Sequence, residues 1–373
     1  MKEFKPDFSR LKKVLLRDGE PDFVPFYDLF ADKEMIEAVV GKPLTVETAA
    51  EFQVKMGYDY VNAGIWFSYP RILRSTDDVA PLSRGKRNFV DDNHGILENR
   101  ADFAAFNWPA ITDSVAYGVN KVLQCLPDGM KVVLSLPGGI LENVMWLMGY
   151  MPFSYALADD EPLVSDLFEK IGYDFTRILR LCLEKTDVDK IGAIVMGDDM
   201  GFNTSTMISP QLLRKYVFPW QKKIVEIVHE YELPMILHSC GNLEAIMDDL
   251  IDDVGIDAKQ SFEDNIMPVS LAKKKYGGRI AILGGADVHS LTSMNEEQVR
   301  EYVGKIIEDC APGGGYALGT GNTVANYIPV ANFLAMLDVG RKKEDTRLVA
   351  ATAKAKQPVE VKTWLKSQNL LSF

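Results

Sequence analysis

Histidine and cysteine are scarce in this chain, with only four of each among 373 residues. The four cysteines stand far apart and do not form the disulfide framework of a small secreted domain. A reducing compartment is the simplest setting for them, and we expect a cytoplasmic protein. The N-terminal stretch MKEFKPDFSRLKK has no apolar core of signal-peptide length, and no run approaches the roughly 18 apolar residues of a membrane span.

Basic side chains are also fewer than acidic ones, and the net charge is -12. Such an acidic chain is not expected to have nucleic acid or an anionic membrane as its main partner. An anionic small molecule in a locally basic pocket is still compatible with it. A homodimer is the commonest oligomer of soluble proteins and is our default expectation.

A Gly-rich phosphate-binding turn is missing after the first predicted strand, where the sequence reads YDLFADKEM, and this argues against a doubly wound nucleotide-binding sheet. Continuous apolar runs of β type recur instead, as expected for parallel strands that are covered on both faces. Helix-like segments separate them, most clearly at 163–185, 209–231 and 295–310. The alternation predicts a (β/α)8 TIM barrel that spans 1–373 as a single domain. The predicted strands are 24–27, 58–62, 131–136, 191–196, 234–238, 256–260, 279–285 and 315–321.

The segment 66–112 does not fit the alternation and is a long insertion after the second predicted strand. Its piece RNFVDDNHGILEN is typical of a hairpin with a turn at 92–95. An insertion at this place lies over the active face of a barrel, so we expect a lid, docking or dimer element. A passive surface excursion is the alternative.

Polar residues gather directly after the predicted strands, where barrel enzymes build their active sites. Three of them are carboxylates that we predict to be catalytic, namely Asp28, Asp198 and Asp199. The two adjacent carboxylates point in different directions, so we expect only one of them to face the site. The residues predicted to bind substrate are Asn62, Glu142, Gln260, Asp287 and Asn322.

The stretch PMILHSCGN places His238 and Cys240 two positions apart at the end of the fifth predicted strand. Residues i and i+2 of a strand face the same side, so an imidazole and a thiol are presented together. These are ligand types that zinc prefers. The alternative is a pair that only packs at the strand end, with the cysteine acting as a small hydrophobe.

A zinc site needs further ligands besides this pair. Asp198, Asp199 and Glu142 follow neighbouring strands and are well placed in a barrel. Glu263 and Cys310 are weaker candidates. Cys310 ends a helix about five residues before the eighth predicted strand, which puts it near the opposite face of the barrel.

Several motifs together resemble the uroporphyrinogen decarboxylase superfamily: HSCGN, ILGGADV, GGGYALGTGN, IPVANFLAMLD and GDDMGFNTSTMISPQLLRKYVFPW. The resemblance implies a (β/α)8 barrel, in agreement with the strand count. It also implies one of two chemistries. The true decarboxylases remove carboxyl groups from a tetrapyrrole without a metal and grip its carboxylates with an Arg-rich N-terminal segment. The corresponding FVPFYDLFADKEM has no arginine, which argues against that activity.

The other branch of the superfamily, the corrinoid-linked methyltransferases, carries a His-x-Cys pair that binds zinc together with a later cysteine. His238 and Cys240 match that pair, whereas the later cysteine position falls in 319–321, which reads GTG. The resemblance therefore implies a methyltransferase that works with a corrinoid (cobalamin) protein partner and a small methylated substrate or thiol, with zinc completed by a carboxylate such as Asp199. Two alternatives stay open: a metal-free decarboxylase that uses Asp28, Asp198 or Asp199, and a non-catalytic barrel that binds a small molecule or a corrinoid partner.

Overall fold

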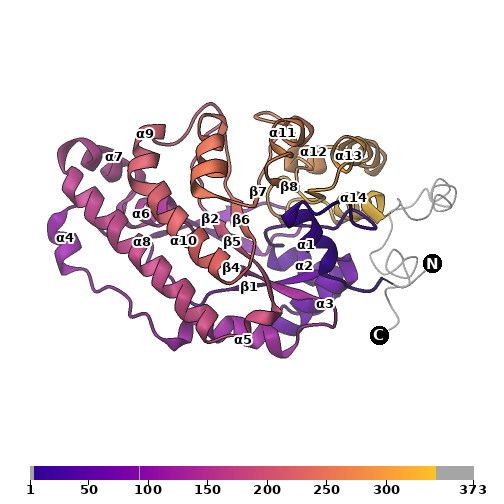
Figure 1. Cartoon of the computed structure of the whole chain (residues 1–373), viewed down its shortest axis with the longest axis horizontal. Helices are drawn as coiled ribbons and strands as arrows, with labels where there is room; N and C mark the ends of the chain where they lie inside the picture. The colour runs from indigo at the N-terminus through magenta and orange to yellow at the C-terminus, as the bar shows by residue number, and fades with distance from the viewer. Residues whose placement is uncertain (1–3, 92, 342–373) are drawn as a thin grey trace.

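A ring of parallel β-segments forms the centre of the protein, whose computed structural model describes residues 4–91 and 93–341. Seven strands make one parallel sheet in the order β1-β4-β5-β6-β7-β8-β9 (Figure 1). Each consecutive pair is parallel, as continuous apolar strands predict. The strands are β1 Tyr60–Gly64, β4 Lys131–Ser135, β5 Ile191–Gly197, β6 Met235–His238, β7 Ala258–Gln260, β8 Ala281–Leu283 and β9 Tyr316–Ala317.

The predicted first strand closes the ring between β9 and β1. Phe26 forms a parallel bridge with Leu318, and the backbone of Tyr27 donates to the Leu318 carbonyl at 2.8 Å. On the other side, the Tyr27 ring stacks on Tyr60 of β1 with 5.5 Å between the ring centroids. The segment pairs over too short a length to be a full strand, but it occupies the eighth position. The (β/α)8 prediction is therefore confirmed.

Helices surround the sheet and account for most of the chain between strands (Figure 1). In the predicted helix 209–231, Ser209 caps the first turn and Pro210 stands in the first helical position. That helix is interrupted by a π-helical turn at Leu213–Val217. No helix within residues 4–91 and 93–341 is long and apolar enough to cross a membrane. The helices are α1 Ser9–Leu16, α2 Lys33–Val40, α3 Val46–Met56, α4 Arg100–Ala105, α5 Tyr117–Gln124, α6 Ile140–Met148, α7 Tyr150–Asp159, α8 Glu161–Glu184, α9 Pro210–Leu212, α10 Phe218–Glu230, α11 Val269–Tyr276, α12 Val288–Ser293, α13 Glu296–Cys310 and α14 Val330–Arg341.

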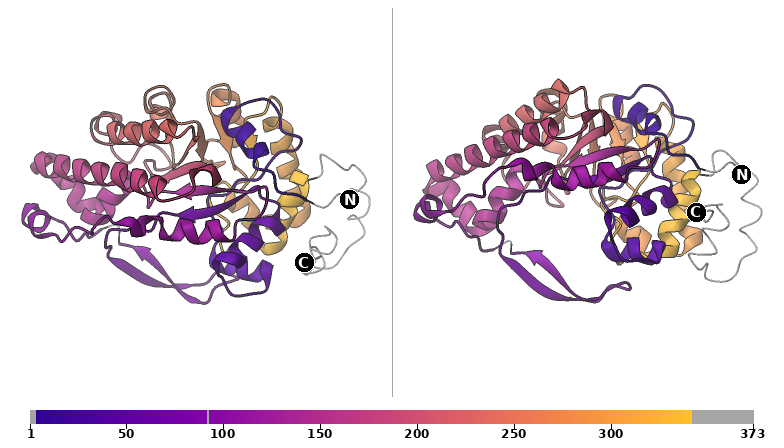
Figure 2. Two further views of the ribbon diagram at one scale, coloured as in Figure 1. Left: turned by 60° about the horizontal axis from the view of Figure 1, so that its bottom comes forward. Right: turned by 90° about the horizontal axis from the view of Figure 1, so that it is seen from below.

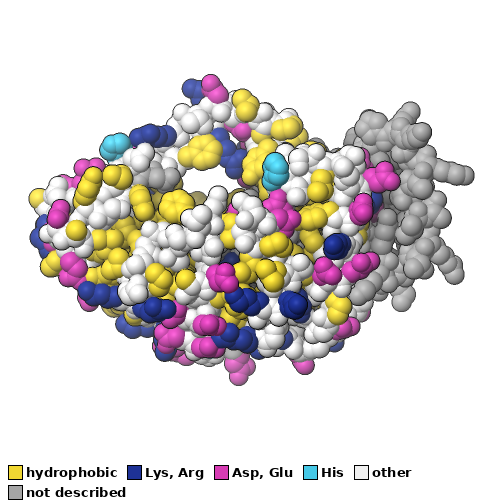
Figure 3. Space-filling view, turned by 90° about the horizontal axis from the view of Figure 1, so that it is seen from above, with side chains coloured by type: hydrophobic (Ala, Val, Ile, Leu, Met, Phe, Trp, Pro, Cys, Tyr) yellow, Lys and Arg dark blue, Asp and Glu magenta, His cyan; other side chains and the backbone are white. Residues whose placement is uncertain are grey.

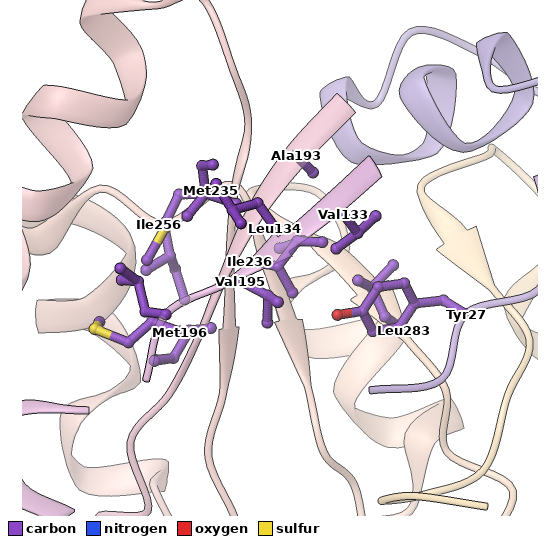
Figure 4. Packing of buried hydrophobic residues seen from close by; sticks show 14 of the residues in the cluster. Tyr27, Val133, Leu134, Ala193, Val195, Met196, Met235, Ile236, Ile256 and Leu283 are labelled. Atoms are coloured by element: carbon purple, nitrogen blue, oxygen red, sulfur yellow. The ribbon is translucent and has the colours of Figure 1, made fainter. Parts of the chain in front are cut away.

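Apolar side chains of neighbouring strands form the hydrophobic core (Figure 4). Every residue from Ile191 to Met196 of β5 is buried, because helices cover the outer face of the strand and other strands fill its inner face. Burying a side chain such as Val or Leu contributes about 1.5–3 kcal/mol relative to leaving it exposed. The rigid strands so formed hold the side chains at their carboxyl ends in place.

The insertion contains an antiparallel hairpin, but its turn is not where the sequence pattern predicts. β2 (Leu73–Asp78) pairs with β3 (Gly85–Val90), and the chain turns at 79–84. Asp78 stabilises this turn by accepting from the backbone of Ala80 at 3.1 Å. The residues that follow the predicted turn do not pair with β3, because Leu97 is buried and its backbone donates to α6 at Leu147. The predicted turn at 92–95 is therefore wrong in the part that the structure describes, and Asp92 lies outside the described residues.

The hairpin is fastened to two other loops of the barrel and forms an arch (Figure 2). Arg87 of β3 donates to both carboxylate oxygens of Asp32 at 2.9 and 3.2 Å, and to the amide oxygen of Asn326 at 3.1 Å. The Asn326 amide donates in turn to Asp78 at 2.7 Å. Asp32 follows the first predicted strand and Asn326 follows β9, so the arch connects to loops at the carboxyl ends of the strands. We call residues 73–90 the arch hairpin.

Candidate metal centre

Three side chains at the carboxyl ends of β5 and β6 come together at the barrel mouth. The Sγ atom of Cys240 lies 3.5 Å from Nε2 of His238, and that Nε2 lies 3.7 Å from Oδ1 of Asp199. One ligand atom from each of the three residues lies within 4.8 Å of the others. The backbone of Cys240 also donates to Oδ1 of Asp199 at 2.8 Å, which fixes the carboxylate against the His-x-Cys segment.

This donor set fits a zinc ion. Ligands at zinc-bond lengths of about 2.0–2.3 Å in a tetrahedral arrangement are about 3.3–3.7 Å apart, and the two measured separations match that spacing. Three protein ligands with a fourth position left for water or substrate are typical of catalytic zinc sites. With Asp199 as the oxygen donor, a three-ligand site would not need the later cysteine.

Gln260 of β7 fixes the orientation of the His238 ring. Its amide nitrogen donates to the carbonyls of Asn322 at 2.6 Å and Thr320 at 3.4 Å, which leaves its amide oxygen as an acceptor. That oxygen is bonded to Nδ1 of His238, so the ring carries its proton on Nδ1. Nε2 is therefore the unprotonated nitrogen and faces Cys240 and Asp199. A partner of this kind behind a ligating imidazole is usual in metal sites.

Asn322 supports the cysteine of the cluster. Its side-chain nitrogen donates to Sγ of Cys240 at 3.1 Å. A donor at this distance favours negative charge on the sulfur, which metal binding requires. The sequence pattern predicts substrate binding for Asn322 and Gln260, whereas the structure shows both in contact with the candidate ligands.

Burial and neighbouring charges control protonation in the cluster. Burial lowers the pKa of His238, against the opposite influence of the Asp199 carboxylate. Burial, and then the charge of Asp199, raise the pKa of the Cys240 thiol. Burial raises the pKa of Glu142 well above its usual range, with Asp199 and Asp198 acting in the same direction. A bound cation reverses the effect on a thiol, because coordination favours the thiolate.

Asp198 points away from the cluster and holds the beginning of α6. Its carboxylate accepts from the backbone of Ile140 at 3.0 Å and of Glu142 at 3.0 Å, and from the amide of Gln221 at 2.8 Å. The side chain is fully buried, and burial raises its pKa to about 6. A β-carbon on Gly139 would lie 2.1 Å from that of Asp198, so only glycine allows this close approach. Asp198 thus joins β5 to α6 and is separated from Asp199 by the alternation of the chain.

Asp28 is also enclosed by hydrogen bonds. Its carboxylate accepts from the Tyr58 hydroxyl at 2.5 Å and from the backbone and hydroxyl of Thr320 at 2.7 and 2.6 Å. Burial raises its pKa from 3.8 to about 6. The residue ties the first predicted strand to the loop after β9, and Thr320 in turn accepts from Gln260.

The raised pKa of Asp28 makes a testable contribution to stability. Between pH 4 and 6 the folded protein holds a proton on Asp28 that the unfolded chain has released. This contribution is fully present below about pH 4 and is lost as the pH rises through 6. Relative to an Asp28→Asn variant, the wild-type protein is expected to lose about 3 kcal/mol of unfolding free energy from pH 4 to 7. Urea unfolding of both proteins measures this difference, and a difference that does not change with pH would contradict the prediction.

The other predicted site residues lie around the cluster or away from it. Asn62 of β1 donates to the Leu29 carbonyl at 3.0 Å, and its amide oxygen has no hydrogen-bond partner among the residues described. Asp287 caps α12 by accepting from Ser290 at 2.9 Å. Glu263 influences the thiol of Cys240 through its charge but does not belong to the three-residue cluster. Cys310 is buried at the end of α13 and is also not part of it.

Lys259 of β7 is not among the predicted site residues, although it lies beside the His-x-Cys segment. Its ammonium group is buried and donates to the carbonyls of Ser239 at 3.2 Å and Ser261 at 2.6 Å. Burial lowers its pKa to about 8. A lysine inside an apolar β-type run, as in IDAKQ, is the sequence signal that identifies such a residue.

The fold and the cluster together define a (β/α)8 barrel with a candidate metal centre at its mouth. The family model for uroporphyrinogen decarboxylase (URO-D) matches residues 135–343, which is more than half of the chain. The protein therefore belongs to the uroporphyrinogen decarboxylase family, and the resemblance seen in its motifs is confirmed. A comparison with curated protein sequences found no match.

Comparison with solved structures found a methyltransferase with the same fold. A methyltransferase from Methanosarcina mazei is 15% identical with a TM-score of 0.65, and the match covers 91% of this chain and all of that protein. A B12-independent methionine synthase from Shewanella sp. W3-18-1 is 14% identical with a TM-score of 0.45, over 89% of this chain and 96% of the other. The first similarity supports the fold, and the second is too weak to carry an argument.

Proposed function

We propose that this protein is a corrinoid-protein-dependent methyltransferase with a zinc ion held by Asp199, His238 and Cys240. The observation that carries the proposal is the convergence of these three donors at the carboxyl ends of β5 and β6. Membership of the URO-D family supports it, together with the resemblance of His238 and Cys240 to the His-x-Cys pair of the corrinoid-linked branch.

The residues around the cluster have separate tasks in this proposal. A zinc ion at this site would supply Lewis-acid chemistry, by polarising a methyl ether or amine or by lowering the pKa of a thiol substrate. Gln260 keeps Nε2 of His238 free of a proton, and Asn322 stabilises negative charge on Cys240. Methyl transfer is a displacement, so holding the reacting carbon in line between donor and acceptor supplies a large part of the rate.

The corrinoid partner is proposed to dock over the barrel mouth and against the insertion. The arch hairpin carries apolar side chains that are exposed to solvent, namely Leu73, Val79 and Phe89. Its attachment through Arg87 to Asp32 keeps it in place. Exposed apolar residues on a fixed hairpin are suited to contact with a second protein. A cytoplasmic location fits a site that needs a reduced thiol.

A metal-free decarboxylase is less well supported by the same residues. Such an enzyme would use Asp28, Asp198 or Asp199 as its acid, and the first two carboxylates are buried and hydrogen-bonded to their neighbours. A tetrapyrrole with many carboxylates also needs several cationic partners. Asp199 is the most accessible of the three predicted catalytic carboxylates, and it belongs to the three-residue cluster of candidate ligands.

A direct assay separates the three functions. Zinc-loaded protein is mixed with free cob(I)alamin in place of the corrinoid protein, together with methyl ethers, methylamines and methyl thioethers in separate reactions. Growth of the methylcobalamin absorbance supports the proposal. Turnover of uroporphyrinogen without metal would instead identify a decarboxylase. No reaction with uroporphyrinogen or with any of these methyl donors would favour a non-catalytic binding barrel.

A further inference from the structure

Arg71 carries a guanidinium group that is not hydrogen-bonded to any side chain among the residues that the structure describes. It makes no hydrogen bond or ion pair with any residue between 4 and 341 that the structure describes, and its Nε atom is fully buried without a partner. The guanidinium instead stacks on Trp146, where its carbon lies 3.6 Å from the ring centroid. A half-buried arginine usually has a carboxylate or carbonyl partner, so an unpaired one is unusual.

This guanidinium lies on the side of the barrel that carries the metal centre. Arg71 follows β1 and precedes the arch hairpin by two residues, while Trp146 belongs to α6, which follows β4. Glu142 stands one turn before Trp146 on the same helix, and its carboxyl group interacts electrostatically with both Arg71 and Asp199. The arginine is therefore in the same electrostatic neighbourhood as the candidate ligands.

Figure 3 shows an opening through the surface, with hydrophobic and basic side chains on its rim. An opening of this kind admits a small molecule into the protein.

We propose that Arg71, stacked on Trp146, binds a carboxylate of the methylated substrate and so turns its methyl-bearing end toward the metal centre. This rests on the proposed function, since it names the substrate class of that site. The planar guanidinium donates two parallel hydrogen bonds to a carboxylate, and the aromatic face holds it in one plane. The substrate class is a small methylated monocarboxylate.

The charges nearby select a carboxylate over a phosphate. Arg71 is a single cation, and the acidic residue that acts on it, Glu142, is itself influenced by the charges of Asp199 and Asp198. One guanidinium balances a monoanion, whereas a phosphate dianion would keep an excess negative charge beside these acids. The net charge of -12 makes an uncompensated dianion still less favourable.

Binding of benzoate to the full-length protein tests this inference without any methyl transfer. Benzamide has the same shape without the charge, and inorganic phosphate provides the dianion. Calorimetric titration is expected to show that benzoate binds at least about tenfold more tightly than either benzamide or phosphate. Equal binding of benzoate and benzamide, or tighter binding of phosphate, would overturn the proposal.

Substitutions assign the binding to Arg71. Arg71→Gln is expected to weaken the binding of benzoate about tenfold to hundredfold. Arg71→Lys is expected to weaken it by a smaller factor, because lysine keeps the charge but lacks the planar guanidinium group. Arg214→Gln is the matched control, since that arginine is exposed and paired with Asp249. Thermal melting checks that each variant is folded, and unchanged benzoate binding in folded Arg71→Gln would overturn the proposal.

A Cys240→Ala variant separates this inference from the proposed function. Benzoate is expected to bind that variant with the affinity of the wild-type protein, because Arg71 does not depend on the ligands of the metal. If the wild-type protein binds no zinc or transfers no methyl group, but still binds benzoate through Arg71, the proposed function alone is refuted. If the protein transfers methyl groups only from uncharged donors, and Arg71→Gln does not change benzoate binding, the carboxylate site alone is refuted.

Discussion

Replacing Cys240 with alanine is expected to lower methyl transfer to cob(I)alamin by at least about a thousandfold, which corresponds to about 4 kcal/mol of transition-state stabilisation. The sulfur lies 3.5 Å from Nε2 of His238 and accepts a hydrogen bond from Asn322 at 3.1 Å. Removing it leaves two donors, His238 and Asp199, which is one fewer than catalytic zinc sites use. The rate of methylcobalamin formation at saturating donor measures the effect.

Cys182→Ala is the matched control for this substitution. Cys182 is buried in α8, and it is not part of the three-residue cluster among the residues described. The Cys182→Ala protein is expected to be less stable, because a buried side chain is shortened, and to transfer methyl groups at the wild-type rate. Retention of more than about a tenth of the wild-type rate in Cys240→Ala would show that the sulfur does not hold an essential metal.

Replacing Asp198 with alanine is expected to lower the free energy of unfolding by about 3–5 kcal/mol. The loss leaves the first backbone N–H groups of α6 and the amide of Gln221 without their acceptor in a fully buried place. Gly139 lies too close for any side chain to fill the space from the helix side. Chemical denaturation at neutral pH measures the change.

The neighbouring residue provides the comparison. Asp199→Ala is expected to cost less than about 1 kcal/mol, because the carboxylate is partly exposed, while zinc affinity falls. Asp198→Ala is thus expected to lower mainly the stability, and Asp199→Ala mainly the affinity for zinc. If Asp199→Ala were the more destabilising of the two, the assignment of Asp198 to α6 and Asp199 to the metal centre would be wrong.

Much of the fold follows from the sequence, because a parallel barrel leaves a strong pattern. Continuous apolar runs such as 191–196 are typical of strands covered on both faces, and the helix cap at Ser209 is a local signal. The predicted hairpin turn is wrong because the sequence pattern of RNFV is equally compatible with pairing to the segment before it and to the segment after it. The burial of Leu97 against α6, a long-range contact, decides between the two.

The candidate site was partly predictable for a similar reason. His238 and Cys240 share a strand end, so their proximity follows from the period of a strand. Which of two adjacent aspartates joins them depends on where α6 begins, and Asp198-Asp199 alone does not contain this information. The roles of Gln260 and Asn322 beside the ligands depend on contacts between separate strands. Arg71 gives no sequence signal, since its isolation appears only when its surroundings are seen.

The zinc content of the purified protein tests the central claim most directly. After incubation with zinc and extensive dialysis, the wild-type protein is expected to contain about one zinc per chain by elemental analysis, and a His238→Ala, Cys240→Ala double variant less than about a tenth of that. Cys182→Ala is expected to match the wild-type value. A folded wild-type protein that keeps no zinc, or a double variant that keeps as much as the wild type, would contradict a metal centre built on Asp199, His238 and Cys240.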